Sequence, residues 1–123
     1  MNLKNNPEID IIRASSSKIN DVDFENLVFG NIFTDHMLVC DYKDGKWQKP
    51  VIRPYEPFLL DPSAKVFHYG QAIFEGMKAY KDNNDDVWLF RPDENFDRFN
   101  KSAVRMAMPE VPEEVFLGGL HEI

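Results

Sequence analysis

The chain has 123 residues, 43% of them hydrophobic and 28% charged, which predicts one small globular domain with a real core. The net charge of -7 excludes a protein that binds nucleic acid mainly through electrostatic attraction to phosphates. The single cysteine, Cys40, excludes an internal disulfide and a multi-cysteine metal site, and the three histidines are too scattered for a zinc motif.

The compartment is predicted by elimination. No apolar run approaches the roughly 20 residues that span a bilayer, so we expect no membrane partner. The polar start of the chain lacks the apolar core of a secretory signal and is too acidic for a typical mitochondrial transit peptide. The expectation is a reducing, cytoplasmic location.

The first part of the chain predicts little packed structure. Residues 1–26 are mostly polar and predict a loosely packed N-terminal extension, in which the isoleucines of 9–12 favour a short strand. The character changes at residue 27, where we place the start of a domain that runs to residue 123. Residues 27–33 are apolar with a Gly-Asn bend and predict an extended segment.

A first hairpin is predicted next. Residues 37–42 favour a strand, Asp44-Gly45 is a turn dipeptide, and residues 47–53 supply the returning strand. Pro50 and Pro54 restrict that second strand to a sheet edge or to a short length, because proline has no N–H to donate.

A second hairpin follows an irregular stretch. Residues 55–67 predict irregular chain, with the apolar residues 58–60 as an anchor. Residues 77–80 and 87–90 favour strands, and the polar run 81–86 favours the turn between them, since Asn and Asp tolerate left-handed backbone angles.

Two helices complete the prediction. The first begins at Pro92-Asp93 with Asp93 as N-cap, and Pro109 ends it. At 100° per residue its apolar stripe comprises Phe96, Phe99, Ala103 and Ala107, and the opposite, basic face comprises Arg98, Lys101, Ser102 and Arg105.

The second helix starts near Pro112 and carries Phe116, Leu120 and Ile123 on one stripe, although Gly118-Gly119 weakens it. Because that stripe reaches the last residue without a cap, we expect the chain to be a fragment of a longer protein. The fold class expected from all these elements is α+β: an antiparallel sheet built from the two hairpins and flanked by the helices.

Two features offer a functional alternative to ordinary structure. Gly70 and Gly76 bracket a bent segment; Tyr69 just before it and Phe74 within it could face a cavity, but spacing alone favours core aromatics. Arg98 could bind a phosphate through two parallel hydrogen bonds, but spacing alone favours a solvated helix face. The many acidic residues lack pairing and predict solvated surface, and the histidines predict structural roles.

Four segments stand out together: Phe29-Gly30-Asn31-Ile32-Phe33-Thr34-Asp35-His36-Met37, the stretch from His68 to Tyr80, Leu89-Phe90-Arg91-Pro92, and the helical run from Asn95 to Ala103. Together they resemble branched-chain amino acid aminotransferases, the fold-type IV group of pyridoxal-phosphate enzymes. Their order and approximate spacing match the small N-terminal domain of such an enzyme, over residues 27–123.

The resemblance implies reversible transfer of an amino group between L-leucine, L-isoleucine or L-valine and 2-oxoglutarate. Arg98 matches the family's arginine that holds the phosphate of pyridoxal 5'-phosphate. Phe29, Tyr69 and Phe74 match aromatic residues that wall the pocket for the branched side chain. A homodimer is implied as well.

The resemblance also implies that this chain has no catalytic residue. In the family, the Schiff-base lysine and the carboxylate that faces the cofactor's pyridine nitrogen lie in the larger C-terminal domain, and no lysine here stands in a matching motif. We therefore expect the fragment alone to be inactive. The alternatives within the fold type are a D-amino acid aminotransferase and an aminodeoxychorismate lyase. Outside it, the alternative is a non-catalytic binding or dimerisation module.

Overall fold

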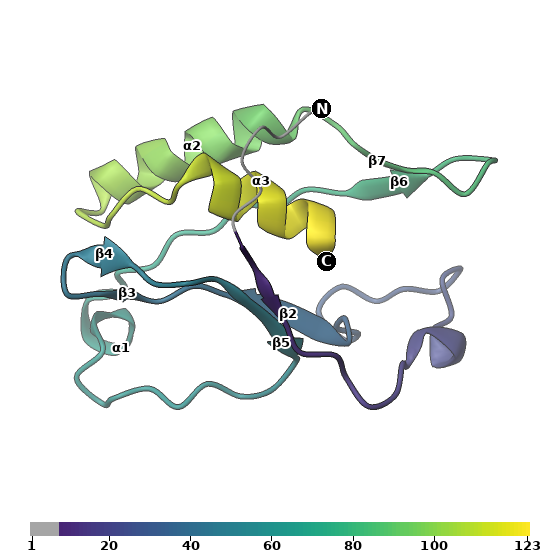
Figure 1. Cartoon of the computed structure of the whole chain (residues 1–123), viewed down its shortest axis with the longest axis horizontal. Helices are drawn as coiled ribbons and strands as arrows, with labels where there is room; N and C mark the ends of the chain where they lie inside the picture. Colours follow the sequence, from purple (N-terminus) through teal and green to yellow (C-terminus); the bar gives the residue numbers. More distant parts are fainter. Residues whose placement is uncertain (1–7) are drawn as a thin grey trace. The chain divides into compact units, whose positions relative to one another are not determined.

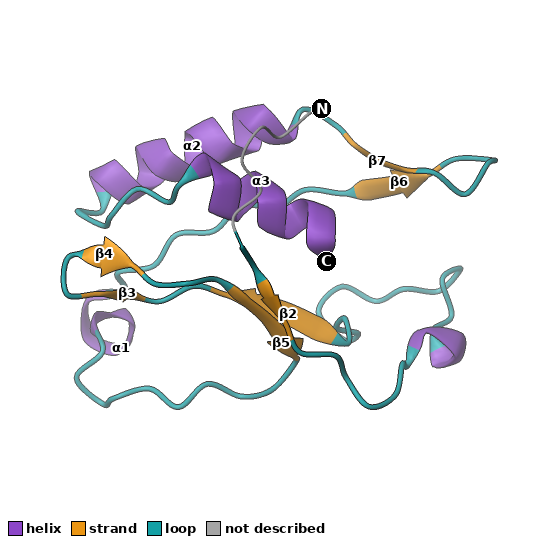
Figure 2. Cartoon of the chain, viewed as in Figure 1, coloured by secondary structure: helices purple, strands orange, loops and turns teal. Residues whose placement is uncertain are grey.

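The computed structural model describes residues 8–123 as an α+β arrangement of short strands and helices (Figure 1). The chain divides into two compact units. One comprises the described residues up to Phe58 together with Gly118–Ile123, and the other comprises Leu59–Leu117. The described strands form three separate small sheets, so the expected single sheet built from both hairpins is wrong (Figure 2).

The first unit is built on a three-stranded sheet of order β1 (Asp10–Ile11), β5 (Val51–Pro54) and β2 (His36–Val39). β2 and β5 are antiparallel, whereas β1 pairs with β5 in parallel. β5 is therefore central, not an edge strand. The alternative of a short strand holds, because Pro50 precedes β5 and Pro54 ends it, which puts both missing N–H groups at its limits.

The predicted first turn is confirmed, with shorter strands around it. β3 (Tyr42–Lys43) and β4 (Lys46–Trp47) form a two-stranded hairpin joined by Asp44 and Gly45. These two residues have φ angles of 53° and 75°, and a two-residue hairpin turn with both φ values positive twists in the same sense as its strands. The rings of Tyr42 and Trp47 meet edge to face across the hairpin, with centroids 5.2 Å apart.

The C-terminal part of α3 (Glu113–Glu122) belongs to this first unit and packs on β2 through a glycine. A Cβ atom added to Gly119 would overlap the side chain of Leu38. The glycine pair that weakens the helix in sequence therefore permits a close approach between helix and strand. The expected stripe is only partly right, since Phe116 and Leu120 are half-buried and Ile123 is exposed.

The second unit contains the other predicted hairpin. β6 (Ala79–Lys81) and β7 (Val87–Leu89) are antiparallel, and Ala79 faces Leu89. The Asp82 carboxylate accepts hydrogen bonds from the backbone N–H groups of Asn84 and Asp86 and from the Trp88 indole N–H. The predicted polar turn is thus confirmed, and it is held by one of its own aspartates.

Two short helices occur where none was predicted. η1 (Ile19–Asp21) is a single 3-10 turn in the first unit, and α1 (Lys65–Tyr69) lies in the stretch expected to be irregular. Gly70 ends α1 with a φ of 58°, as glycine commonly does after a helix. Residues 58–60 are exposed, so the expectation of an apolar anchor there is wrong.

α2 (Pro92–Arg105) is the longest helix of the described chain. Arg91 is its N-cap and Pro92 its first residue, so Asp93 lies in the first turn and is not the cap. The helix ends at Arg105, ahead of Pro109. Ala107 of the expected stripe lies beyond it with a φ of 53°.

The apolar side of α2 is otherwise as predicted. Ala103 is fully buried, and the half-buried rings of Phe96 and Phe99 lie 5.7 and 5.3 Å from that of Phe116. Asn100 closes the connection to α3: its amide N–H donates to the carbonyl of Val111, and its amide oxygen accepts from the N–H of the same residue.

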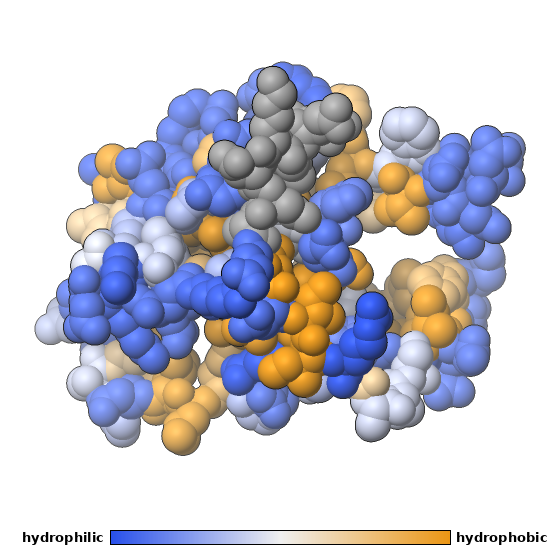
Figure 3. Space-filling view, viewed as in Figure 1, coloured by the Kyte–Doolittle hydropathy of each residue, from blue (hydrophilic) through white to orange (hydrophobic). Residues whose placement is uncertain are grey.

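Few side chains of the described residues are fully buried. The buried hydrophobic residues are Ile52, Ala103, Val115 and Leu117, whereas many large hydrophobic residues are exposed. Figure 3 shows apolar residues in orange, open to solvent on the face in view. Within residues 8–123, no helix combines the length and apolarity needed to cross a bilayer.

Candidate functional site

The segment that follows Gly70 shows the burial pattern of a strand, although no described strand pairs with it. From Gln71 to Lys78 the residues alternate between half-buried and exposed, the period-two pattern of extended chain. Glu75 falls on the half-buried side and Phe74 on the exposed side. The alternation therefore aims a carboxylate inward from an otherwise mainly apolar stretch.

Glu75 meets two side chains of α2. The Arg98 Nε–H donates to Glu75 Oε1 over 2.6 Å, and Arg98 Nη2 donates to Oε2 over 2.7 Å. Asn95 Nδ2 donates to the same Oε2 over 2.8 Å. Asn95 and Arg98 lie three residues apart on α2, and residues at that spacing share a helix face. The helix thus presents two donors to one carboxylate.

The electrostatics follow from these contacts. The hydrogen bond from Arg98 is the main reason why the pKa of Glu75 lies below its usual value, and Asn95 adds to the effect. The same hydrogen bond raises the pKa of Arg98. Both groups therefore stay charged at neutral pH. The Glu75 side chain is only 6% exposed, whereas that of Arg98 is 68% exposed.

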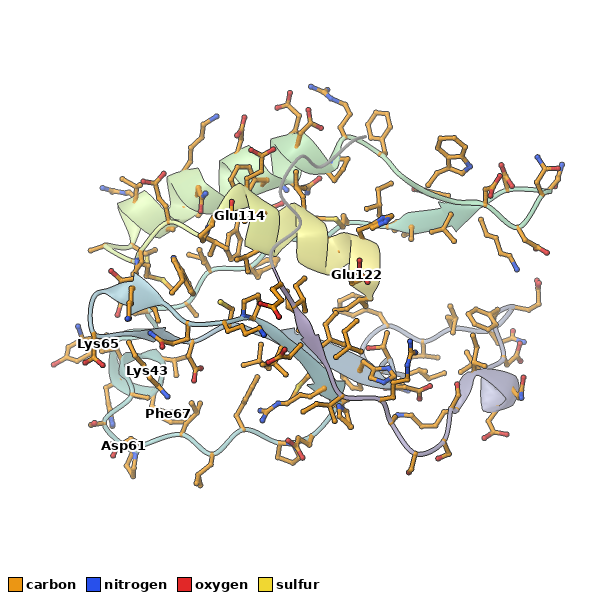
Figure 4. All side chains as sticks on the ribbon, in the orientation of Figure 1. Lys43, Asp61, Lys65, Phe67, Glu114 and Glu122 are labelled. Carbon is orange, nitrogen blue, oxygen red and sulfur yellow. The ribbon has the colours of Figure 1, made fainter. Side chains whose placement is uncertain are left out.

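A separate open hollow of about 370 Å³ lies within the second unit. It is lined by Lys65 and Tyr69 of α1, by Gln71, and by Met106 just after α2. Gln71 Nε2 donates a hydrogen bond to the Met106 carbonyl over 2.8 Å and so ties the two sides together. Figure 4 labels Lys65 and Phe67, which mark α1.

The structure brings together only some of the predicted site residues. Arg98 is bound to Glu75, the neighbour of Phe74 in the chain, and Tyr69 lines the hollow. Neither Phe74 nor Arg98 lines that hollow. Tyr69 and Phe74 are 81% and 88% exposed, so the packing of the described chain does not use their rings as core. Phe29 is also fully exposed and belongs to the first unit.

Sequence reasoning missed Glu75. It treated the acidic residues as unpaired, solvated surface, which is wrong for this carboxylate and also for Asp82. The available signal was a single acid inside a mainly apolar stretch together with Asn95 and Arg98 on one helix face. By contrast, the structural roles expected of His36 and His68 agree with their contacts: His36 Nε2 accepts from the Ala14 N–H, and His68 Nε2 lies 2.8 Å from the Pro62 carbonyl oxygen.

Residues 8–123 contain no group of three or more His, Cys, Asp or Glu side chains that could hold a metal ion. Lys101 and Arg105 are exposed on the basic face of α2, as expected for a solvated surface. The pair of Glu75 and Arg98, in which an enclosed carboxylate meets an exposed guanidinium, is therefore the candidate site.

The chain is similar in sequence to curated enzymes. It is 52% identical over 102 residues to branched-chain-amino-acid transaminase 1 of Bacillus subtilis, a match that covers 82% of this chain and 29% of the relative. It is 44% identical over 119 residues to the branched-chain-amino-acid aminotransferase of Mycolicibacterium smegmatis, covering 96% and 30%. It is 52% identical over 91 residues to the cytosolic enzyme of that name from Saccharomyces cerevisiae, covering 72% and 24%.

These matches extend over most of this chain but over a minority of each relative. The chain spans about 30% of the length of the curated relatives it matches. No protein-family model matches the chain.

Proposed function

We propose, from the premise that this chain is homologous to branched-chain-amino-acid aminotransferases, that it forms the N-terminal part of such an enzyme. The complete enzyme moves an amino group between L-leucine, L-isoleucine or L-valine and 2-oxoglutarate. The observation that carries the proposal is an identity of 44–54% to proteins of this name over most of the chain. Residues 27–123 would be the small domain of the fold-type IV architecture, preceded by the extension 1–26.

The proposed cofactor is pyridoxal 5'-phosphate, which supplies an electron sink for the amino-group transfer when it is bound. Arg98 is the residue of this chain that would hold its phosphate. The arrangement around Arg98 fits that task, because its guanidinium is exposed and Glu75 engages only one edge of it. An arginine fork matches a phosphate with two parallel hydrogen bonds.

The substrate pocket is proposed to include Phe29, Tyr69 and Phe74. Their rings are exposed in the described chain and are therefore free to be covered by substrate or by the rest of the enzyme. Apolar walls select aliphatic side chains, but one methylene changes the discrimination by only about 1–3 kcal/mol. We therefore expect activity to be spread over leucine, isoleucine and valine.

The amine that bonds to the cofactor is proposed to lie outside this segment. Lys65 is the lysine nearest to a hollow, but it is exposed and lacks the desolvated surroundings that activate a lysine amine. The 123 residues alone would therefore not turn over substrate. A homodimeric, cytoplasmic enzyme is part of the proposal, and the yeast relative is named as a cytosolic protein.

The test is an amino-transfer assay of the complete enzyme that carries this segment, with pyridoxal 5'-phosphate present. We expect turnover of L-leucine, L-isoleucine and L-valine with 2-oxoglutarate, and none by the 123-residue chain. Turnover of D-alanine alone, or of aminodeoxychorismate alone, would assign the protein to another activity of the same fold type. Failure to bind the cofactor at all would leave only a binding or dimerisation module.

A further inference from the structure

Glu75 and Arg98 form a pair whose two members are unequally exposed. The carboxylate is almost enclosed, with 6% of its side chain exposed, and it receives three hydrogen bonds from Arg98 and Asn95. The guanidinium on the other side of the pair is open to solvent. The pair therefore joins an enclosed carboxylate to a cation whose side chain stays 68% exposed.

The bonding pattern selects one edge of the guanidinium. A guanidinium carries five N–H groups, and Glu75 accepts one from Nε and one from Nη2. Both Nη1–H groups and the second Nη2–H are left to other acceptors. Two of these three lie side by side on the Nη1/Nη2 edge, which is the bidentate edge that Glu75 leaves unused and that a phosphate could take.

Holding the Arg98 guanidinium in place should change its affinity for a phosphate, and this change can be measured. An unrestrained arginine side chain loses rotamer freedom when it binds a ligand, and a group that is already held avoids that loss. The carboxylate also acts in the opposite direction, because its negative charge repels a phosphate. The two effects differ in sign, so an experiment can tell which one dominates.

We propose that Glu75 is a positioning residue for Arg98, which it holds with the outer edge of the guanidinium presented to the phosphate of the cofactor. This inference rests on the proposed function. It assigns Asn95 a supporting role, since Asn95 donates to the same carboxylate oxygen as Arg98 Nη2. It also links the segment that carries Phe74 to the helix that carries the phosphate-binding residue.

The test compares two ligands in the complete enzyme: pyridoxal 5'-phosphate and pyridoxal, which lacks the phosphate. We expect Glu75→Gln to weaken binding of the phosphorylated ligand by about 10- to 100-fold, the value of hydrogen bonds to a charged group, and to leave pyridoxal binding nearly unchanged. Dissociation constants from cofactor absorbance or fluorescence titrations give the readout. The matched control is Glu94→Gln, because Glu94, in the first turn of α2, also pairs with an arginine, the N-cap residue Arg91.

Each outcome decides the matter. Tighter binding of the phosphorylated ligand to Glu75→Gln would show that the carboxylate merely neutralises Arg98. An equal loss for both ligands would show a purely structural role. Either result, or no change, overturns the inference while the proposed function stands on the wild-type titration. A wild-type enzyme that binds neither ligand overturns the proposed function instead.

Two further variants guard against misfolding and test whether Glu75 acts through Arg98. Asn95→Ala removes one donor from Glu75 without changing any charge, and we expect a smaller loss of phosphate selectivity in the same direction. In an Arg98→Lys background, where the fork is absent, Glu75→Gln should cause no further loss of that selectivity. An undiminished effect of Glu75→Gln on the lysine background would contradict positioning through Arg98.

Discussion

At the scale of single residues, the clearest electrostatic contact of the described chain is made by one carboxylate, that of Glu75. Glu75 is enclosed, accepts three hydrogen bonds, and has a pKa lowered chiefly by Arg98. A carboxyl group whose folded-state pKa is depressed stabilises the fold at pH values above its unfolded pKa of about 4.3. That contribution is lost as the pH falls through the lower folded-state pKa.

We therefore expect Glu75→Gln to be less stable than the wild-type chain at pH 7, and the difference to shrink as the pH drops below about 4. The neutral amide resembles the protonated acid, which accounts for the convergence. Urea unfolding of both chains between pH 2.5 and pH 7 measures it. Asp97→Asn, at an exposed position on the same helix, is the control. A stability difference that stayed constant with pH would contradict the assignment.

A second prediction at this scale concerns substrate choice. In the complete enzyme, Phe74→Ala should lower kcat/KM for L-leucine by about 10- to 100-fold, which corresponds to about 1–3 kcal/mol of lost apolar contact. The loss should be larger for leucine than for valine, whose side chain is one methylene shorter. The control is Phe67→Ala, an exposed aromatic residue on α1 (Figure 4). An equal loss for both amino acids would argue against a pocket role.

At the scale of elements, α3 and β2 approach closely because Gly119 has no side chain at the point where it faces Leu38. Gly119→Ala would place a methyl group against Leu38, and overpacking of this kind costs about 1–3 kcal/mol. The better helix propensity of alanine offsets only about 0.5–1 kcal/mol of this. We expect a net loss of stability in chemical unfolding.

The same prediction has an internal check. With Leu38→Ala already in place, the three atoms nearest to the added methyl group are gone, so Gly119→Ala should be neutral or stabilising on that background. If Gly119→Ala changed the stability equally on the two backgrounds, the contact with Leu38 would not be the reason for a glycine at position 119.

Elements with local causes could be predicted from the sequence. Asp44-Gly45 requires two positive φ angles, and the run around Asp82 forms its own hydrogen bonds, so both turns are where the residues indicate. Strand partners are not encoded locally, which is why β5 proved central and the hairpins formed separate sheets. The short helix α1 was missed because its five residues are too few to show a helical period.

The candidate site divides in the same way. The helical period places Asn95 and Arg98 on one face of α2, and this could be read from spacing alone. Their partner Glu75 lies 23 residues before Arg98, and only the folded chain brings the two together. The mainly apolar stretch around Glu75 sets it apart from the acids that remain solvated, but the sequence does not say which residues it meets.

At the scale of the whole molecule, the described part of the chain has little core for its length. Few hydrophobic side chains are buried among residues 8–123, and many large ones are exposed. Apolar surface on this scale is typical of a face that another part of a protein covers. The relatives it matches are more than three times as long as the matched part, which agrees with such a cover.

The isolated 123-residue chain should therefore bind a hydrophobic dye such as ANS more strongly, per mole of chain, than the complete enzyme does. Its thermal unfolding should also be broader, because a small core gives weak cooperativity. Fluorescence titration and calorimetry measure these properties, with the urea-unfolded chain as the control for unspecific dye binding. A sharp transition without dye binding would mean that the segment is a self-sufficient domain.

The amide of Asn100 bonds Val111 through both its donor and its acceptor. Asn100→Asp would keep the size of the side chain but exchange the NH2 donor for an oxygen. The aspartate would set an anion against the carbonyl oxygen that the amide now satisfies. This one exchange would turn the contact between the last two helices from attraction into repulsion.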